Sequence, residues 1–219
     1  MYFKLVICFF GNNLFLEFQE KLGILKKQIA FFDFDGTLIK GDSFFMFANF
    51  LVGKKKLYNI LLKNIINIAL CILGLKNNGI IKEKIFCELY KGIAYDDFKN
   101  TGVDFIDVLD KRINQLGLKL LNDFQKQEKE IVIVSASIKE WIEPWALKYG
   151  VKTVISTEIN IDNKGNLTGS FSTLNCNEKE KVVRILEIYP DLKEYESYAI
   201  GDSDGDKDMF GIVDHHIKV

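Results

Sequence analysis

The chain has 219 residues, of which 48% are hydrophobic and 27% charged, and its formal net charge is −1. This composition is typical of a soluble globular protein with one core domain and room for a smaller insertion. So small a net charge argues against a nucleic-acid partner. Four cysteines without C-x-x-C spacing argue against a disulfide framework, so we expect reduced thiols and a cytoplasmic location.

Residues 1–27 are predicted to be an N-terminal extension of the core. The apolar run at 5–10 is short and ends at Gly11-Asn12-Asn13, without the small residues of a cleavage site. We therefore expect neither a signal peptide nor a membrane-spanning helix here. Residues 14–27 are compatible with an amphipathic helix, and the sequence indicates no role for it.

The most informative segment is 29–38, an apolar run that ends in two carboxylates, Asp33 and Asp35. A buried strand followed by Gly36 and Thr37 delivers both acids to the carboxyl edge of a sheet, where open α/β sheets build their sites. Because Gly36 breaks the strand, we expect Asp35 to turn beside Asp33. Two carboxylates placed side by side repel each other unless they share a proton or bind a cation. Mg²⁺, which prefers oxygen ligands, is a suitable cation.

Helices and strands alternate along the remaining chain. The residue pattern predicts helices over 42–92 and 95–125, a strand over 130–135, a helix over 139–148 and a strand over 151–156. A hairpin over 158–171 with a turn at 163–166, a helix over 177–188 capped by Asn177, and a strand over 198–201 complete the order.

This order predicts an α/β fold, a doubly wound and mostly parallel Rossmann-like sheet with a helical cap inserted after the first core strand, plus a β-hairpin. We assign 1–27 to the extension, 28–42 and 115–219 to the core domain, and 43–114 to the cap domain. The two tryptophans of the 139–148 helix, Trp141 and Trp145, are interpreted as packing residues. His215 and His216 are interpreted as a surface pair.

Three predicted strands each end in a polar cluster, and the carboxyl ends of parallel strands meet at one edge. The clusters are Asp33 with Asp35, Ser135, and Asp202 with Asp206. Phosphoryl transfer needs a nucleophile, a proton donor for the leaving oxygen and nearby positive charge. Asp33 suits the nucleophile, and Asp35 suits the acid that later serves as base.

The other candidates surround the phosphate. Ser135, Gly36 and Thr37 are candidates for binding the phosphate oxygens, and Lys181 supplies fixed positive charge as a catalytic and phosphate-binding residue. Asp202 and Asp206 are candidates to complete a Mg²⁺ shell with Asp33 and Asp35.

Taken together, Asp-Phe-Asp-Gly-Thr at 33–37, Ser135, Lys181 and Gly-Asp-x-x-x-Asp at 201–206 resemble the four motifs of the haloacid dehalogenase (HAD) superfamily. The resemblance covers about residue 29 to the end of the chain. Val134-Ser-Ala-Ser137, Leu167-Thr-Gly169, and Cys176 five residues before Lys181 are similar to subfamily IB, the phosphoserine-phosphatase-like group with a C1-type helical cap.

The resemblance implies a Mg²⁺-dependent enzyme whose metal is held by Asp33, the backbone carbonyl of Asp35, and Asp202. Dehalogenases of the superfamily lack the second acid, and transport ATPases carry threonine in its place. Asp35 therefore favours phosphatase or phosphotransferase chemistry, with an aspartyl-phosphate intermediate.

The cap segment is apolar and basic, which bears on the substrate. Between residues 44 and 95, eight lysines stand against two acids, a local excess of +6. The segment is similar to that of the HAD-type phosphatidylglycerophosphatase C group, which implies a lipid-linked or otherwise amphiphilic phosphomonoester and peripheral contact with the inner membrane face. Residues 57–72 carry one narrow polar stripe, and we favour burial in a bundle-like cap over membrane contact.

Two alternatives stay open. A phosphoserine-phosphatase-like enzyme acting on a small metabolite would use Asp42 to bind the substrate amino group, but residues 42–92 contain no arginine for the carboxylate. The second alternative is a non-catalytic, membrane-docked binding module on a HAD scaffold. The sequence does not indicate an oligomeric state.

Overall fold

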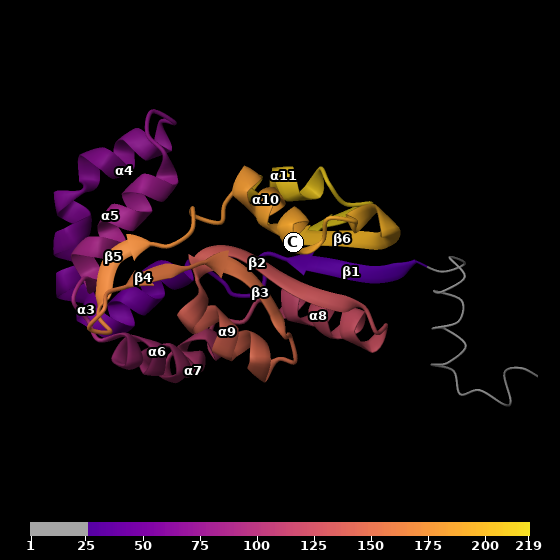
Figure 1. The fold of residues 1–219 in the computed structure, drawn as a ribbon, viewed down its shortest axis with the longest axis horizontal. Helices are drawn as coiled ribbons and strands as arrows, with labels where there is room; N and C mark the ends of the chain where they lie inside the picture. Colours follow the sequence, from indigo (N-terminus) through magenta and orange to yellow (C-terminus); the bar gives the residue numbers. More distant parts are fainter. Residues whose placement is uncertain (1–25) are drawn as a thin grey trace, which may run out of the picture.

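β1 (Lys27–Phe32) is the central strand of a five-stranded sheet in the computed structural model, which describes residues 26–219 (Figure 1). Its apolar residues are fully buried on both faces. Ala30 and Phe32 belong to one hydrophobic core, and Ile29 and Phe31 belong to a second core on the opposite face. A strand covered on both faces carries a continuous apolar run instead of an alternating one, which explains the sequence of 29–32.

The sheet has the order β3-β2-β1-β6-β7, and every neighbouring pair is parallel. The other strands are β2 (Glu130–Ile138), β3 (Thr153–Thr157), β6 (Tyr195–Gly201) and β7 (His215–Lys218). The chain proceeds from β1 outward to β3 on one side, and then returns to place β6 on the other side of β1. The strand order therefore reverses between β1 and β6, where open α/β sheets bind their ligands.

Five helices lie between β1 and α8 in the chain: α3 (Ser43–Lys63), α4 (Ile65–Ile72), α5 (Asn78–Tyr90), α6 (Tyr95–Asp104) and α7 (Ile106–Asp110). The helices that flank the sheet are α8 (Gln115–Lys126), α9 (Lys139–Lys148), α10 (Lys179–Ile188) and α11 (Lys207–Phe210), with short 3₁₀ helices at Leu192–Glu194 and Asp204–Asp206. In Figure 1, α8 and α9 cover one face of the sheet, and α10 and α11 cover the other. This arrangement confirms the predicted doubly wound α/β fold.

The predicted hairpin is also present, as a separate two-stranded antiparallel sheet of β4 (Ile159–Ile161) and β5 (Leu167–Phe171). It lies against α5 (Figure 1), where the backbone N–H of Phe171 donates to Glu83 Oε1 at 2.8 Å. The assignment of domain boundaries stays a prediction. α6 packs on α9, with Gly102 lying close to the carbonyl of Glu140.

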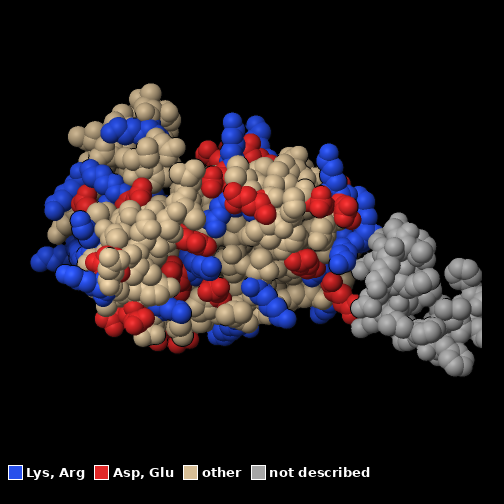
Figure 2. Space-filling model, in the orientation of Figure 1, with Lys and Arg blue, Asp and Glu red and all other residues tan. Residues whose placement is uncertain are grey.

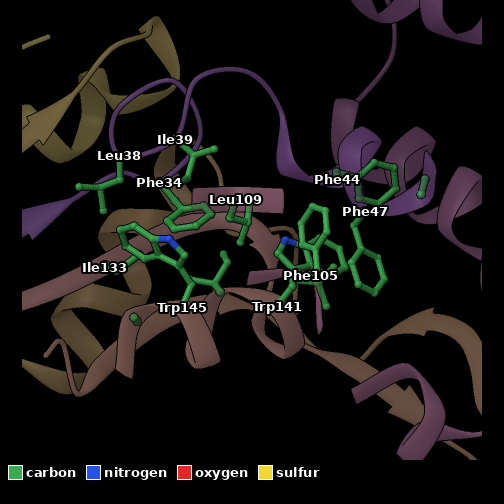
Figure 3. Packing of buried hydrophobic residues seen from close by; sticks show 14 of the residues in the cluster. Phe34, Leu38, Ile39, Phe44, Phe47, Phe105, Leu109, Ile133, Trp141 and Trp145 are labelled. Atoms are coloured by element: carbon green, nitrogen blue, oxygen red, sulfur yellow. The ribbon is translucent and has the colours of Figure 1, made fainter. Parts of the chain in front are cut away.

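Aromatic packing joins the cap helices to α9 (Figure 3). Trp141 and Trp145 are fully buried, which confirms their interpretation as packing residues. Trp141 stacks on Phe47 of α3 with ring centroids 4.4 Å apart, and Trp145 meets Phe34 edge-on at 5.2 Å. Phe34 lies between the two acids of the first motif, so this cluster anchors the loop that carries them.

The expected burial of residues 57–72 is wrong for most of the segment. The helix breaks at Asn64, and no residue of α4 is buried. Asn64 points inward instead, where its amide donates to the Ile60 carbonyl and to Glu88 Oε1. Ile66 and Ile72 are 73% and 82% exposed. Leu57 and Ile60 are buried and Ile68 packs against the core, so burial holds for one side of the segment only.

Two smaller expectations also fail. Asn177 does not cap α10, because the helix begins at Lys179 after Glu178, which has φ 50° and makes no side-chain cap. His215 and His216 are exposed as expected, but they open β7, an edge strand that the sequence analysis did not predict. The suggested amphipathic helix over 14–27 lies outside the described residues, apart from its last two.

Of the described cysteines, Cys71, Cys87 and Cys176 are free thiols. None of the helices described between residues 26 and 219 is long and apolar enough to cross a membrane.

Candidate active site

The switch point between β1 and β6 brings three carboxylates together. Asp33 follows β1 directly, and its backbone N–H donates to the Ile200 carbonyl of β6 at 2.8 Å. Asp202 follows β6, and Asp206 lies at the end of the 3₁₀ turn after it. Carboxylate oxygens of these three residues lie within 4.8 Å of one another.

Two glycines make room for these carboxylates. A Cβ at Gly36 would lie 2.1 Å from Asp202 Oδ2, and Gly36 has φ +86°, a conformation that other residues adopt only under strain. A Cβ at Gly201 would lie 2.6 Å from the carboxyl carbon of Asp206. The N–H of Gly36 donates to the Ile39 carbonyl at 2.7 Å, so it already has an acceptor. The clearest function of Gly36 in the structure is therefore steric.

Lys181 of α10 lies inside the carboxylate cluster and is only 2% exposed. Its Nζ is 2.6 Å from Asp33 Oδ1 and 2.6 Å from Asp206 Oδ1. Asp206 Oδ2 also accepts hydrogen bonds from the backbone of Asp202 and from Ser203. Both oxygens of Asp206 are thus engaged, which fixes the turn and positions Lys181.

The charge balance of this cluster favours a divalent cation. If all three carboxylates were ionised, they and one ammonium would leave two negative charges in a largely buried site. Uncompensated charge in such a place is costly, and oxygen donors are the ligands that hard divalent cations prefer. The residues present therefore fit a divalent metal ion.

The excess of negative charge is also seen in the pKa values of Asp33 and Asp202, which are raised. Burial raises the pKa of Asp33 to about 7, because the lowering effect of Lys181 does not cancel the burial and the neighbouring Asp206. Burial and then Asp206 raise the pKa of Asp202. Burial lowers the pKa of Lys181, but Asp33 and Asp206 outweigh this and leave it above its ordinary value. Lys181 is therefore firmly cationic, and a bound cation would favour the ionised form of both acids.

Asp35 lies apart from the three-carboxylate cluster, although we expected it to turn beside Asp33. Its carboxylate accepts hydrogen bonds from the backbone N–H of Ser43 at 2.7 Å and from the hydroxyls of Ser43 and Ser137. The indole N–H of Trp141 donates to Ser43 Oγ at 3.0 Å. Burial and the nearby Asp42 raise the pKa of Asp35 to about 6, against the lowering effect of its hydrogen bonds.

Sequence reasoning assigned no role to Ser43 and Ser137, which hold Asp35 in place. The repeated serine of Val134-Ser-Ala-Ser137 was the available signal for Ser137. Ser43 lies 94 positions from Ser137 in the chain, yet their hydroxyl oxygens are 3.0 Å apart. Only the packing of the cap on the core creates this contact.

The remaining predicted residues lie around this centre. Thr37 is fully buried and its hydroxyl donates to Asp33 Oδ2 at 3.1 Å. Ser135 is buried within β2, just before the pairing with β3 shifts register, and its Oγ accepts from the N–H of Ser137 at 3.0 Å. Asp42 is exposed and caps α3, its Oδ1 accepting from Phe44 N at 2.9 Å and Phe45 N at 3.4 Å. A substrate contact by Asp42 stays a prediction.

Sequence reasoning also missed Lys82 as a residue of the site. This lysine of α5 reaches from the cap to β2, where its Nζ donates to the Ala136 carbonyl at 2.9 Å.

Comparison with known proteins agrees with this geometry. Residues 30–211 match the sequence model of the haloacid dehalogenase-like hydrolases. The chain is 27% identical over 185 residues to protein CicA of Caulobacter vibrioides, covering 84% of this chain and 82% of CicA.

Solved structures show the same fold at low sequence identity. A protein of unknown function from Bordetella pertussis Tohama I has a TM-score of 0.76 and 21% identity, covering 88% of this chain and 90% of that one. A phospho-aspartyl intermediate analogue of phosphoserine phosphatase has a TM-score of 0.61 and 18% identity, covering 88% and 86%. Since the family match spans most of the chain, including all four motifs, this protein belongs to the haloacid dehalogenase-like hydrolase family.

Proposed function

We propose that the chain is a Mg²⁺-dependent phosphatase that hydrolyses a phosphomonoester through an aspartyl-phosphate on Asp33. The observation that carries this proposal is the largely buried cluster in which three carboxylates surround a single ammonium, that of Lys181. Asp35, held separately by Ser43 and Ser137, supports it by supplying a second acid that is free of the cluster.

In the first step, a carboxylate oxygen of Asp33 attacks phosphorus as the bond between phosphorus and the ester oxygen breaks. The leaving oxygen takes the proton of Asp35, whose pKa of about 6 keeps part of the carboxyl protonated near neutrality. Lys181, 2.6 Å from Asp33, offsets negative charge throughout.

In the second step, water attacks the phosphorus of the aspartyl-phosphate while Asp35 accepts the proton of the water. The bond between Asp33 and phosphorus breaks, inorganic phosphate leaves, and the Asp33 carboxylate is restored. Mg²⁺, held by Asp33, Asp202 and the carbonyl of Asp35 as the family resemblance implies, would neutralise charge on the phosphoryl oxygens. The Ser135 and Thr37 hydroxyls are available to phosphate oxygens.

Hydrolysis of p-nitrophenyl phosphate with and without Mg²⁺ tests the proposal. The wild type should turn over and form an acid-stable phosphoenzyme, and Asp33→Asn should lose both. Asp208→Asn, in α11 directly after the acidic loop and outside the cluster, is the matched control and should keep both. Absence of turnover with every divalent cation would favour the non-catalytic module, and phosphoenzyme formed by Asp33→Asn would refute the nucleophile.

We further propose that the substrate is lipid-linked or otherwise amphiphilic, and that the cap meets an anionic membrane surface. The support is an apolar tip on the cap, defined as the five exposed residues Ile65, Ile66, Ile72, Leu73 and Leu75, which are 57% to 82% exposed. Patches of this kind on soluble proteins usually mark an interaction site.

The same part of the chain carries exposed lysines: Lys63 and Lys76 are close to the tip residues in sequence, and Lys54 and Lys55 lie earlier on α3. Figure 2 shows the tip as a mostly tan projection with blue side chains gathered on the cap beside it. Each lysine near an anionic bilayer contributes about 1 kcal/mol to binding. An apolar surface with cations on the same part of the molecule complements the headgroup zone of such a bilayer better than it complements a neutral protein surface.

Co-sedimentation with vesicles of phosphatidylglycerol and phosphatidylcholine tests the membrane contact. The double variant Ile66→Ser with Ile72→Ser should bind the vesicles more weakly. The double variant Leu147→Ser with Val183→Ser changes exposed apolar residues outside the cap and should bind like the wild type. Pure phosphatidylcholine vesicles should bind poorly. Equal binding by both double variants would remove the tip from the proposal, and a clear preference for phosphoserine in a substrate panel would favour the small-metabolite alternative.

A further inference from the structure

Lys82 is a cap residue whose charged end lies in the core. It leaves α5, passes 5.0 Å from the ring centroid of Phe44, and donates to the Ala136 carbonyl at 2.9 Å. Ala136 stands between Ser135, a candidate for binding phosphate, and Ser137, which holds Asp35. The ammonium therefore lies at the junction of cap and core, on a carbonyl one residue along the chain from the serine that holds the proposed proton donor.

The Lys82 ammonium is desolvated but has no close ion-pair partner among the described residues. Within residues 26–219, no carboxylate oxygen lies within 4.0 Å of Lys82 Nζ, whereas Lys181 has two at 2.6 Å. An ammonium has three N–H donors, and the Ala136 carbonyl takes one. Burial lowers the pKa of Lys82, and the more distant Asp42, Asp35 and Asp33 act against this, which agrees with a desolvated cation that is not closely paired.

The side on which Lys82 lies indicates which part of a substrate it can meet. The phosphoryl group must contact Asp33, where Lys181 already supplies the positive charge. Asp35 must contact the leaving oxygen. Lys82 reaches the carbonyl next to the serine that holds Asp35, so it lies on the leaving-group side of the site.

We propose that Lys82 binds an anionic group on the leaving portion of the substrate, a carboxylate or a second phosphate, and so selects phosphomonoesters that carry a second negative charge. This rests on the proposed phosphatase function and defines its substrate class. A lysine acts as a point charge on a flexible stem, without the bidentate geometry of arginine. It therefore suits either anion, in a small metabolite or in a lipid headgroup.

Binding measured by calorimetry with Ca²⁺ in place of Mg²⁺ tests this selection without depending on turnover. Two matched pairs serve as probes: glycerol 3-phosphate with 3-phosphoglycerate, and 3-hydroxypropyl phosphate with propane-1,3-diyl bisphosphate. The wild type should bind the more anionic member of at least one pair about tenfold more tightly or better. The pair that shows this preference identifies the anion, and phosphatidic acid compared with phosphatidylglycerophosphate in micelles tests the lipid source.

Lys82→Met should abolish this preference, and Lys82→Arg should keep much of it. Lys84→Met is the matched control, because Lys84 is an exposed lysine on the same helix, and it should bind like the wild type. An equal loss for both members of each pair would show that Lys82 only latches the cap to the core, and would overturn the proposal, as would a wild type without preference. Selective binding without any hydrolysis in Mg²⁺ would instead refute the phosphatase function and leave the role of Lys82 standing.

Discussion

Replacing Lys181 with methionine is the sharpest test of the charge balance in the site. Lys181 is 2% exposed and its Nζ lies 2.6 Å from both Asp33 and Asp206. Methionine keeps much of the side-chain volume but removes the only ammonium paired with the carboxylate cluster in the described structure. Breaking a buried ion pair by removing one partner typically costs about 3–5 kcal/mol, because it leaves buried charge without compensation.

The loss of stability should depend on pH in a direction that follows from the acids. Burial already raises the pKa of Asp33 from 3.8 to about 7, and Lys181 opposes this rise. Without Lys181 the folded pKa should be higher still, so the folded variant binds more protons than the unfolded chain between the two pKa values. Stability of the variant must then fall as the pH rises through this window, and its deficit relative to the wild type should be larger at about pH 8 than at about pH 5.

Urea unfolding of the metal-free proteins at these two pH values measures the deficit. At the alkaline value, a loss of about 3–5 kcal/mol corresponds to a melting temperature lower by roughly 6–20 °C for a domain of this size. Lys179→Met, an exposed lysine of the same helix, is the control and should change stability little. A deficit below about 1 kcal/mol, or one that is equal at both pH values, would refute the reasoning.

Three further outcomes are expected from the same geometry. Gly36→Ala should weaken Mg²⁺ binding by at least about tenfold in calorimetry, because metal ligands tolerate shifts of only about 0.2 Å and the added Cβ must displace Asp202; Gly165→Ala, equally left-handed but with open space around it, should leave the affinity unchanged. Asp35→Asn should keep Mg²⁺ binding and slow p-nitrophenyl phosphate turnover by roughly 10²-fold, and a near-normal rate would assign the proton to another group. Because protons compete with Mg²⁺ for Asp33, whose pKa is about 7, Mg²⁺ affinity should rise from about pH 6 to about pH 8 and then level off, and a flat profile would contradict this.

The sheet and the convergence of the acids were predictable because each rests on a strong local signal. The run at 29–32 is continuously apolar, and Gly36 breaks the strand directly after the two acids. Strand ends of parallel sheets meet at one edge whatever the details of the loops. β7 escaped prediction because it is a four-residue edge strand that opens with two histidines, without an apolar run.

The surroundings of Asp35 were not predictable, because they depend on residues far apart in the chain. Ser137 is 102 positions from Asp35, and Lys82 is 54 positions from Ala136. No spacing rule connects such pairs, and each arises only when the cap packs onto the core through Phe47 and Trp141. The sequence could therefore indicate an acid and base without showing what orients it.

The apolar tip of the cap could not be predicted for a different reason. Hydrophobic periodicity predicts a helix, but it does not indicate what covers the apolar side of that helix. The helix breaks at Asn64, whose buried amide donates to the Ile60 carbonyl and Glu88, and beyond it Ile65, Ile66 and Ile72 of α4 are exposed. Burying one large aliphatic side chain is worth about 1.5–3 kcal/mol, so five exposed residues leave substantial stabilisation unrealised in water. Such a surface gains stability when an apolar medium or partner covers it, and the exposed lysines of the cap favour an anionic one. The failed burial prediction is therefore itself the strongest argument for membrane contact.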